Sequence, residues 1–179
     1  MPQCWRHVSL IWSVQAADIL PEKITPEVGK EYYTRYNFMY ERGTHLTTNY
    51  WRGDLVPVNS KVKLVSIDDE MVIEVNGEEV EFDNAEKFTK RNISEIASEL
   101  LSPKPIALNK VPEDFIEDVK IGNMRLGMTK EQVLMTRGYP PRHKTPSTDA
   151  NRWIYWSSRF VNRTLVFKDG KLTQGRGLY

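Results

Sequence analysis

The sequence predicts an α+β protein of two modules: a small antiparallel β module over residues 31–105 and a domain of two helices and a three-stranded antiparallel sheet over residues 106–179. Three observations support this fold class. Apolar residues alternate with period two through the first module, as in half-buried strands. Asn76-Gly77 and Asp169-Gly170 are dipeptides favoured in two-residue β-hairpin turns. Each module also contains one helix-starting capping box.

The strands of the first module are short and follow one another without an intervening helix. One side of the first strand carries Tyr32, Thr34, Tyr36, Phe38 and Tyr40, and the other side carries Arg35, Asn37 and Glu41. Further segments are predicted at Leu46–Trp51, Lys61–Ile67, Met71–Val75 and Glu78–Phe82. Short antiparallel strands in this order favour an SH3-like barrel or a curled sheet, with the tyrosine stripe in its core.

A helix closes the first module. Asn92 is a favoured N-cap residue, and Glu95 three positions later completes the capping box. We expect its apolar face to cover the strands; that face consists of Ile93, Ile96, Ala97, Leu100 and Leu101. The proline-containing stretch Ser102–Pro105 then ends the helix, and we place the module boundary there.

The second module begins with two predicted helices. Pro112 suits the first position of a short helix, whose Phe115, Ile116 and Val119 would face the core. Thr129 caps the second helix with Gln132 in capping-box spacing, and Gly138 ends it after Arg137. A polar loop leads to three strands, predicted at Arg152–Ser157, Arg163–Lys168 and Lys171–Gln174.

The order of motifs in residues 112–179 resembles the outer-membrane assembly lipoprotein family BamE, also called SmpA/OmlA. The matching residues are Gly127-Met128-Thr129, Gln132-Val133, Gly138-Tyr139-Pro140, Trp153-Ile154-Tyr155, Leu165-Val166-Phe167 and Leu172. The chain departs from the pattern at Arg137, where the family usually has an apolar residue. The resemblance implies the fold shared with β-lactamase inhibitor proteins, and a non-enzymatic binding or scaffolding role in outer-membrane protein assembly or envelope maintenance.

Charge is distributed unevenly along the chain. Residues 1–119 hold 13 Lys/Arg and 21 Asp/Glu, a net charge of −8, whereas residues 120–179 hold 12 and 3, a net charge of +9. Such asymmetry indicates either an anionic partner for the basic half or docking of the two halves on each other. Both interpretations remain open at this point.

Aromatic and basic residues of the second module form the predicted binding surface. Its members are Arg142, Lys144, Arg152, Trp153, Tyr155, Trp156, Arg159 and Arg163. Strand alternation sends Trp153 and Tyr155 to one face and Trp156 to the other. This set suits an envelope protein or an anionic lipid surface, and no nucleic acid is expected because no RNP or KH motif is present. Alternatively, Trp156 packs against the first module.

Residues 1–30 are interpreted as a leader and linker. A short apolar run ends at Val14-Gln15-Ala16, a pattern that signal peptidase reads, which predicts a periplasmic or outer-membrane-peripheral protein; without cleavage the protein would be cytoplasmic. Cys4 precedes that run and does not fit a lipobox. Since no apolar run reaches about 18 residues, no transmembrane segment is expected.

Catalytic motifs are not apparent in the sequence. We find no glycine-rich phosphate loop, nucleophile elbow or metal-ligand spacing, and therefore predict no catalytic residues, cofactor or metal. The alternative is a small hydrolase-like enzyme with a site at the junction of the two modules. That alternative requires a cleft there that contains a residue with a perturbed pKa.

Overall fold

A computed structural model describes residue 20, residues 22–176 and residue 178. The protein is α+β, and in these residues eleven strands form three sheets accompanied by four α-helices. The strands are β1 (Glu31–Thr34), β2 (Phe38–Tyr40), β3 (Thr44–Leu46), β4 (Asp54–Val56), β5 (Lys61–Ile67), β6 (Met71–Val75), β7 (Glu78–Asp83), β8 (Leu101–Ser102), β9 (Arg152–Ser158), β10 (Val161–Lys168) and β11 (Lys171–Gly175). The helices are α1 (Glu86–Thr89), α2 (Ile93–Leu100), α3 (Glu113–Ile121) and α4 (Lys130–Arg137).

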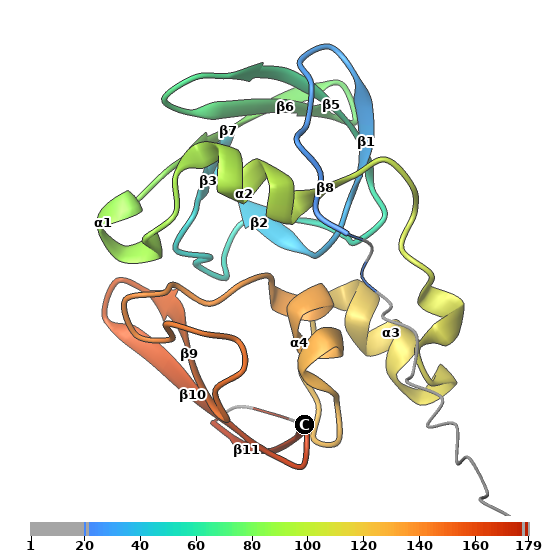
Figure 1. Cartoon of the computed structure of the whole chain (residues 1–179), viewed down its shortest axis with the longest axis vertical. Helices are drawn as coiled ribbons and strands as arrows, with labels where there is room; N and C mark the ends of the chain where they lie inside the picture. Colours follow the sequence, from blue (N-terminus) through green and yellow to red (C-terminus); the bar gives the residue numbers. More distant parts are fainter. Residues whose placement is uncertain (1–19, 21, 177, 179) are drawn as a thin grey trace, which may run out of the picture.

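The elements form two stacked parts (Figure 1). The upper part contains a six-stranded sheet, in the order β3-β7-β6-β5-β1-β8, with α2 beside it, and the separate pair β2-β4. The lower part contains α3, α4 and the three-stranded sheet β11-β10-β9. The predicted cleavage site Val14-Gln15-Ala16 lies outside the described residues. No helix among the described residues is long and apolar enough to cross a membrane.

The central strands of the first module match the prediction. β5 and β6 have the predicted bounds, and Asn76 and Gly77 adopt the positive φ values of a type I′ turn, 54° and 83°. The prediction of a wholly antiparallel module is wrong at one edge, because β3 pairs with β7 in parallel, with His45 opposite Phe82. A tight turn with positive φ at Arg42 and Gly43 sends the chain from β2 into this strand.

The prediction of one continuous first strand is also wrong. The chain bends after Thr34, so that β1 joins the large sheet and β2 pairs with β4. Arg35 and Asn37, which were expected on the solvent side, are buried in this bend. Their backbone N–H groups donate to Leu100 O at 2.7 Å and to Met135 O at 2.9 Å, and these bonds replace strand pairing.

The helix α2 confirms the predicted start but not the predicted end. The Asn92 side chain accepts from the Glu95 N–H at 2.9 Å, and the Glu95 side chain accepts from the Asn92 N–H at 3.0 Å. The predicted apolar face is buried. Leu101 does not extend the helix, because Leu101 and Ser102 form β8 and pair with β1.

The second module follows its predicted order closely. Thr129 and Gln132 form the expected capping box, and α4 runs to Arg137. Asp169 and Gly170, with φ values of 52° and 76°, turn β10 into β11. Pro112 is the N-cap and not the first helical residue, because its ψ of 137° is extended. The apolar side chains of this module form a core that includes Met128, Val133, Met135, Trp153, Tyr155, Leu165 and Phe167.

The two modules are joined through Asn37, whose bonds we call the polar seam. Its Nδ2 donates to Val119 O and to Thr136 O, the latter at 3.2 Å. Its Oδ1 accepts from the Val58 N–H at 2.6 Å, and Val58 itself belongs to the core of the second module. One buried asparagine of the first module therefore holds the backbone ends of α3 and α4.

Candidate functional site

Two members of the predicted binding surface are core residues. Trp153 and Tyr155 are both 0% exposed and pack in the core of the second module. Trp153 Nε1 donates to Ala150 O at 2.9 Å, and Tyr155 Oη donates to Gly138 O at 2.7 Å. Because their faces and polar atoms are already used, these side chains are not available to a partner. Their inclusion in a binding surface is corrected accordingly.

Trp156 lies on the opposite face of β9, as the alternation predicts, and is half-buried. Its ring stacks on His143, with ring centroids 5.8 Å apart and an interplanar angle of 23°. His143 in turn meets Phe88 of α1 edge to face, with centroids 5.3 Å apart. The His143 N–H also donates to Phe88 O at 3.1 Å. Trp156 is therefore connected to the first module through His143.

These aromatic side chains line a cavity of about 450 Å³ between the modules, which we call the junction cleft. It is lined by Thr48, Tyr50, Phe88, His143, Trp156, Arg159 and Phe160. In Figure 1 the turn between β9 and β10 lies next to α1, where the two modules meet. Phe160, at this turn, is 86% exposed. Large apolar side chains gathered at an open cavity are a common mark of an interaction site.

The wall of the junction cleft contains a hydrogen-bond donor without an acceptor. Trp156 Nε1 is enclosed and has no hydrogen-bond partner among the described residues, and the neighbouring Ser157 Oγ has none either. An enclosed N–H that lacks an acceptor costs about 1–3 kcal/mol.

The predicted basic residues fall into three groups. Arg142 points into the junction, where its Nη1 lies 3.2 Å from Glu95 Oε1 and its Nη2 lies 3.6 Å from Glu99 Oε1. It therefore docks the basic half on the acidic half. Arg152 is exposed at the start of β9, and Arg163 lies half-buried opposite Tyr155. Lys144 and Arg159 are exposed beside His143 and in the cleft wall, respectively.

Positive charge surrounds the aromatic walls. Burial, and then the positive charges of Lys144 and Lys90, lower the pKa of His143, while its contact with Phe88 O opposes this shift. His143 is therefore a neutral stacking partner at physiological pH. Lys87, beside Phe88 in α1, adds a further exposed cation. The rim cations, which we define as Lys87, Lys90, Lys144 and Arg159, suit a ligand with negative charge around an apolar group.

The side chains that line the junction cleft are mainly aromatic. Among the residues that line the junction cleft there is one imidazole, and there is no carboxylate or thiol. Within the described part of the chain, no group of three or more His, Cys, Asp or Glu side chains is placed to hold a metal ion. The arrangement can bind and orient a ligand by stacking and charge.

Of the seven residues that line the cleft, the predicted binding surface contained Trp156 and Arg159. Thr48, Tyr50 and Phe88 come from the first module, and only tertiary packing brings them next to Trp156. For Phe88 the sequence contains one signal, because this large apolar residue lies between Lys87 and Lys90. Comparison of the chain with family models, curated proteins and solved structures finds no match.

Proposed function

We propose that this chain is a non-enzymatic binding or scaffolding protein of a bacterial envelope, and that its junction cleft holds an apolar side chain from an acidic segment of a partner protein. One observation carries the proposal: a cavity of about 450 Å³ is lined by Tyr50, Phe88, His143, Trp156 and Phe160 between the two modules. The rim cations would pair with the acidic flanks of that segment.

The free energy of burial favours an apolar side chain that enters the cleft. Burying a Leu or Phe side chain fully contributes about 1.5–3 kcal/mol, and favourable aromatic contacts add about 0.5–1.5 kcal/mol. The cations add orientation and association rate more than affinity. A protein segment is favoured over a lipid surface because the walls come from both modules and enclose a cavity, whereas a flat bilayer contacts protruding side chains. Phe160 and Phe88 are the exposed large apolar side chains of the walls.

The envelope location and the family assignment belong to this proposal. Support for a BamE-like domain in residues 112–179 is the order α3, α4, β9, β10 and β11, which agrees with the helix, loop and strand order of the resemblance. Support for a curled sheet in the first module is the six-stranded sheet with α2 against it. The leader interpretation of residues 1–30 supports a periplasmic or outer-membrane-peripheral site.

The enzyme alternative requires a cleft at the junction that contains a residue with a perturbed pKa, and this site has both. A cleft is present at the junction, and it contains His143, whose pKa is lowered by burial and nearby cations. A general base must also be oriented by a partner and face a reacting group. His143 Nδ1 lies 3.1 Å from the backbone oxygen of Phe88, and the imidazole ring stacks on Trp156. These contacts favour a stacking role.

The test uses fluorescein-labelled peptides with the full chain. The probe is Asp-Glu-Phe-Glu-Asp, and the matched peptides replace Phe by Ala or the four acids by Lys. We expect the acidic Phe peptide to bind, and Trp156→Ala to weaken it at least tenfold, which is about 1.4 kcal/mol. Arg159→Gln should reduce the dependence of binding on salt, since exposed charges act over about 8 Å at physiological ionic strength.

Controls separate the cleft from general basicity. Arg152→Gln removes an exposed cation at the other end of β9 and should leave affinity within a factor of two. Vesicles of phosphatidylglycerol and a single-stranded oligonucleotide are measured in the same salt series. Tighter binding to either of these than to the peptide, or equal binding by the Phe and Ala peptides, would overturn the proposal.

A further inference from the structure

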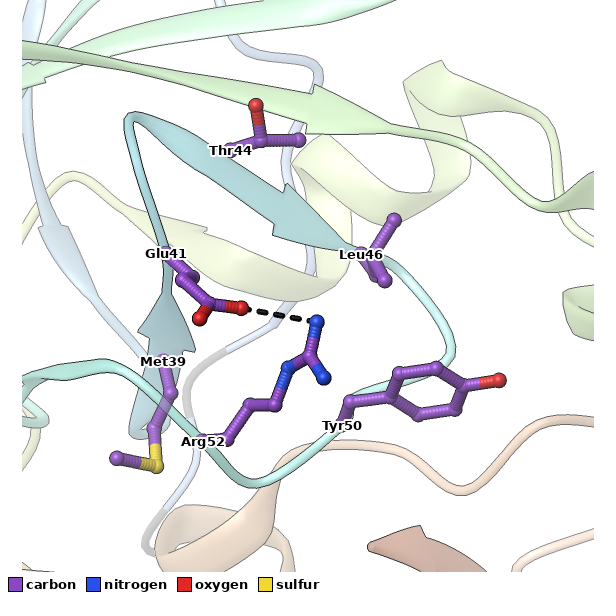
Figure 2. Close-up of a pocket in the computed structure, with 6 residues that line it drawn as sticks. All are labelled: Met39, Glu41, Thr44, Leu46, Tyr50 and Arg52. Carbon is purple, nitrogen blue, oxygen red and sulfur yellow. Dashed lines mark ion pairs between the residues drawn. The ribbon is translucent and has the colours of Figure 1, made fainter. Parts of the chain in front are cut away.

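A second, smaller pocket adjoins the junction cleft. It has a volume of about 170 Å³ and is lined by Met39, Glu41, Thr44, Leu46, Tyr50 and Arg52 (Figure 2). Tyr50 lines both this side pocket and the junction cleft. The two cavities therefore share one tyrosine, which belongs to the loop that follows β3.

The chemistry of the side pocket differs from that of the cleft. Met39 of β2 and Leu46 of β3 provide unbranched and branched aliphatic walls, both half-buried. Glu41 and Arg52 reach toward each other across the pocket in Figure 2, with Glu41 Oε2 2.8 Å from Arg52 Nη2. Both charged side chains are largely exposed, so this ion pair is weak and exchangeable. The pocket suits a medium-sized aliphatic side chain with an acidic neighbour that competes for Arg52.

We infer that the partner segment binds in an extended conformation and is recognised at two positions, an aromatic side chain in the junction cleft and an aliphatic side chain in the side pocket. This inference rests on the proposed function and specifies the sequence pattern of the segment that the cleft would bind. Side chains two residues apart on an extended chain point the same way and lie about 7 Å apart. We choose this separation because Tyr50 lines both cavities.

Charge selects the residues between and beside the two anchors. The rim cations lie on the cleft side, and Arg52 lies on the side-pocket side. An acidic residue next to the aliphatic anchor would pair with Arg52 and displace Glu41, whereas a basic residue there would meet Arg52 and be repelled. The expected pattern is therefore aromatic and aliphatic residues two apart, with acidic residues in the remaining positions.

A peptide series on the wild-type chain tests this pattern directly. The probes are nine-residue acidic peptides with Phe at the centre and Leu two residues before or two residues after it. Each has a comparator in which Leu is replaced by Ser, matched in length and charge. We expect one of the two Leu peptides, the one in the correct direction, to bind at least fivefold tighter than its Ser comparator. If both Leu peptides bind with the same affinity as their comparators, the side pocket does not bind the Leu side chain and the inference is wrong.

Two substitutions then locate the second anchor. Leu46→Trp fills the side pocket and should abolish the Leu preference while leaving the five-residue peptide unaffected. Arg52→Gln, at an exposed position that does not challenge folding, should reduce the preference for an acid beside Leu. A Leu preference that survives both substitutions would overturn the inference. Failure of the proposed function is distinguishable, since the five-residue peptide would then not bind at all.

Discussion

The polar seam and the junction cleft lie at the same junction between the modules but have opposite character. In the polar seam, buried Asn37 uses its N–H, its Nδ2 and its Oδ1 on partners in both modules. In the junction cleft, Phe88 and Phe160 remain exposed and Trp156 Nε1 has no partner among the described residues. The difference indicates that the seam holds the modules together, whereas the cleft is left open for a ligand.

The largest effect is expected from Asn37→Ala. The change removes three side-chain hydrogen bonds and leaves the Val58 N–H buried without its acceptor. Since an unmade buried hydrogen bond costs about 1–3 kcal/mol, the free energy of unfolding should fall by about 4 kcal/mol. Urea unfolding measures this value, with Asn162→Ala on the exposed surface of β10 as the control. A loss below about 1 kcal/mol would contradict the role of the seam.

A second large effect is expected from pH through His45. Burial lowers its pKa from 6.5 to about 4, and its Nδ1 lies 2.8 Å from Met39 O. The unfolded chain therefore takes up a proton on His45 below pH 6.5, whereas the folded chain does so only near pH 4. Stability contributed by neutral His45 is present above pH 6.5 and is lost as pH falls toward 4, by about 3 kcal/mol.

The comparison of wild type with His45→Phe isolates this contribution. The variant keeps an aromatic ring between Phe38 and Phe82 and removes the titrating group. Chemical unfolding at several pH values between 7 and 4 should show a flatter profile for the variant. Parallel profiles for the two proteins would show that His45 does not control the loss in acid.

Thr129→Ala should cost about 1 kcal/mol, because the N-cap hydrogen bond to the Gln132 N–H, 3.2 Å long, is lost. Thermal melts report the change. The reciprocal bond from the Thr129 N–H to Gln132 Oε1 does not use the substituted side chain. Gln132→Ala, which removes that reciprocal bond, is therefore the comparison. Equal melting temperatures for the wild type, Thr129→Ala and Gln132→Ala would contradict the capping role.

The smallest effect on stability is expected in the junction cleft. Phe160→Ser removes a side chain that is 86% exposed, and the free energy of unfolding should change by less than about 0.5 kcal/mol. Peptide binding should nonetheless weaken severalfold. A destabilisation comparable with that of Asn37→Ala would show that the cleft is a second seam.

Local signals in the sequence predicted much of this fold, and long-range contacts explain where prediction failed. The capping boxes and the turns at Asn76-Gly77 and Asp169-Gly170 were predictable because their hydrogen bonds join residues close in sequence. The bend at Asn37 was not, because its partners include Thr136, which lies 99 residues away. Arg142 was interpreted as a free surface cation because its partner Glu95 lies 47 residues away.

Prediction of the site from the sequence was limited by the same long-range contacts. The face of β9 on which Trp156 lies followed from alternation in one strand, and Arg159 was predicted as a basic residue close to aromatic ones. Tyr50 and Phe88 could not be placed, since no periodicity links them to the second module. Trp153 and Tyr155 were included because aromatic residues near basic ones resemble a binding surface, and burial of that strand face removed them.

The most direct measurement of the central claim is the ¹H–¹⁵N resonance of the Trp156 indole during titration with the acidic Phe peptide. Trp156→Phe assigns the resonance among those of the five tryptophans. Because Trp156 lines the junction cleft, we predict that its indole resonance shifts as the peptide enters, together with backbone signals of Tyr50 and Phe88. Saturable peptide binding that leaves the Trp156 indole and these neighbours unshifted would contradict the account.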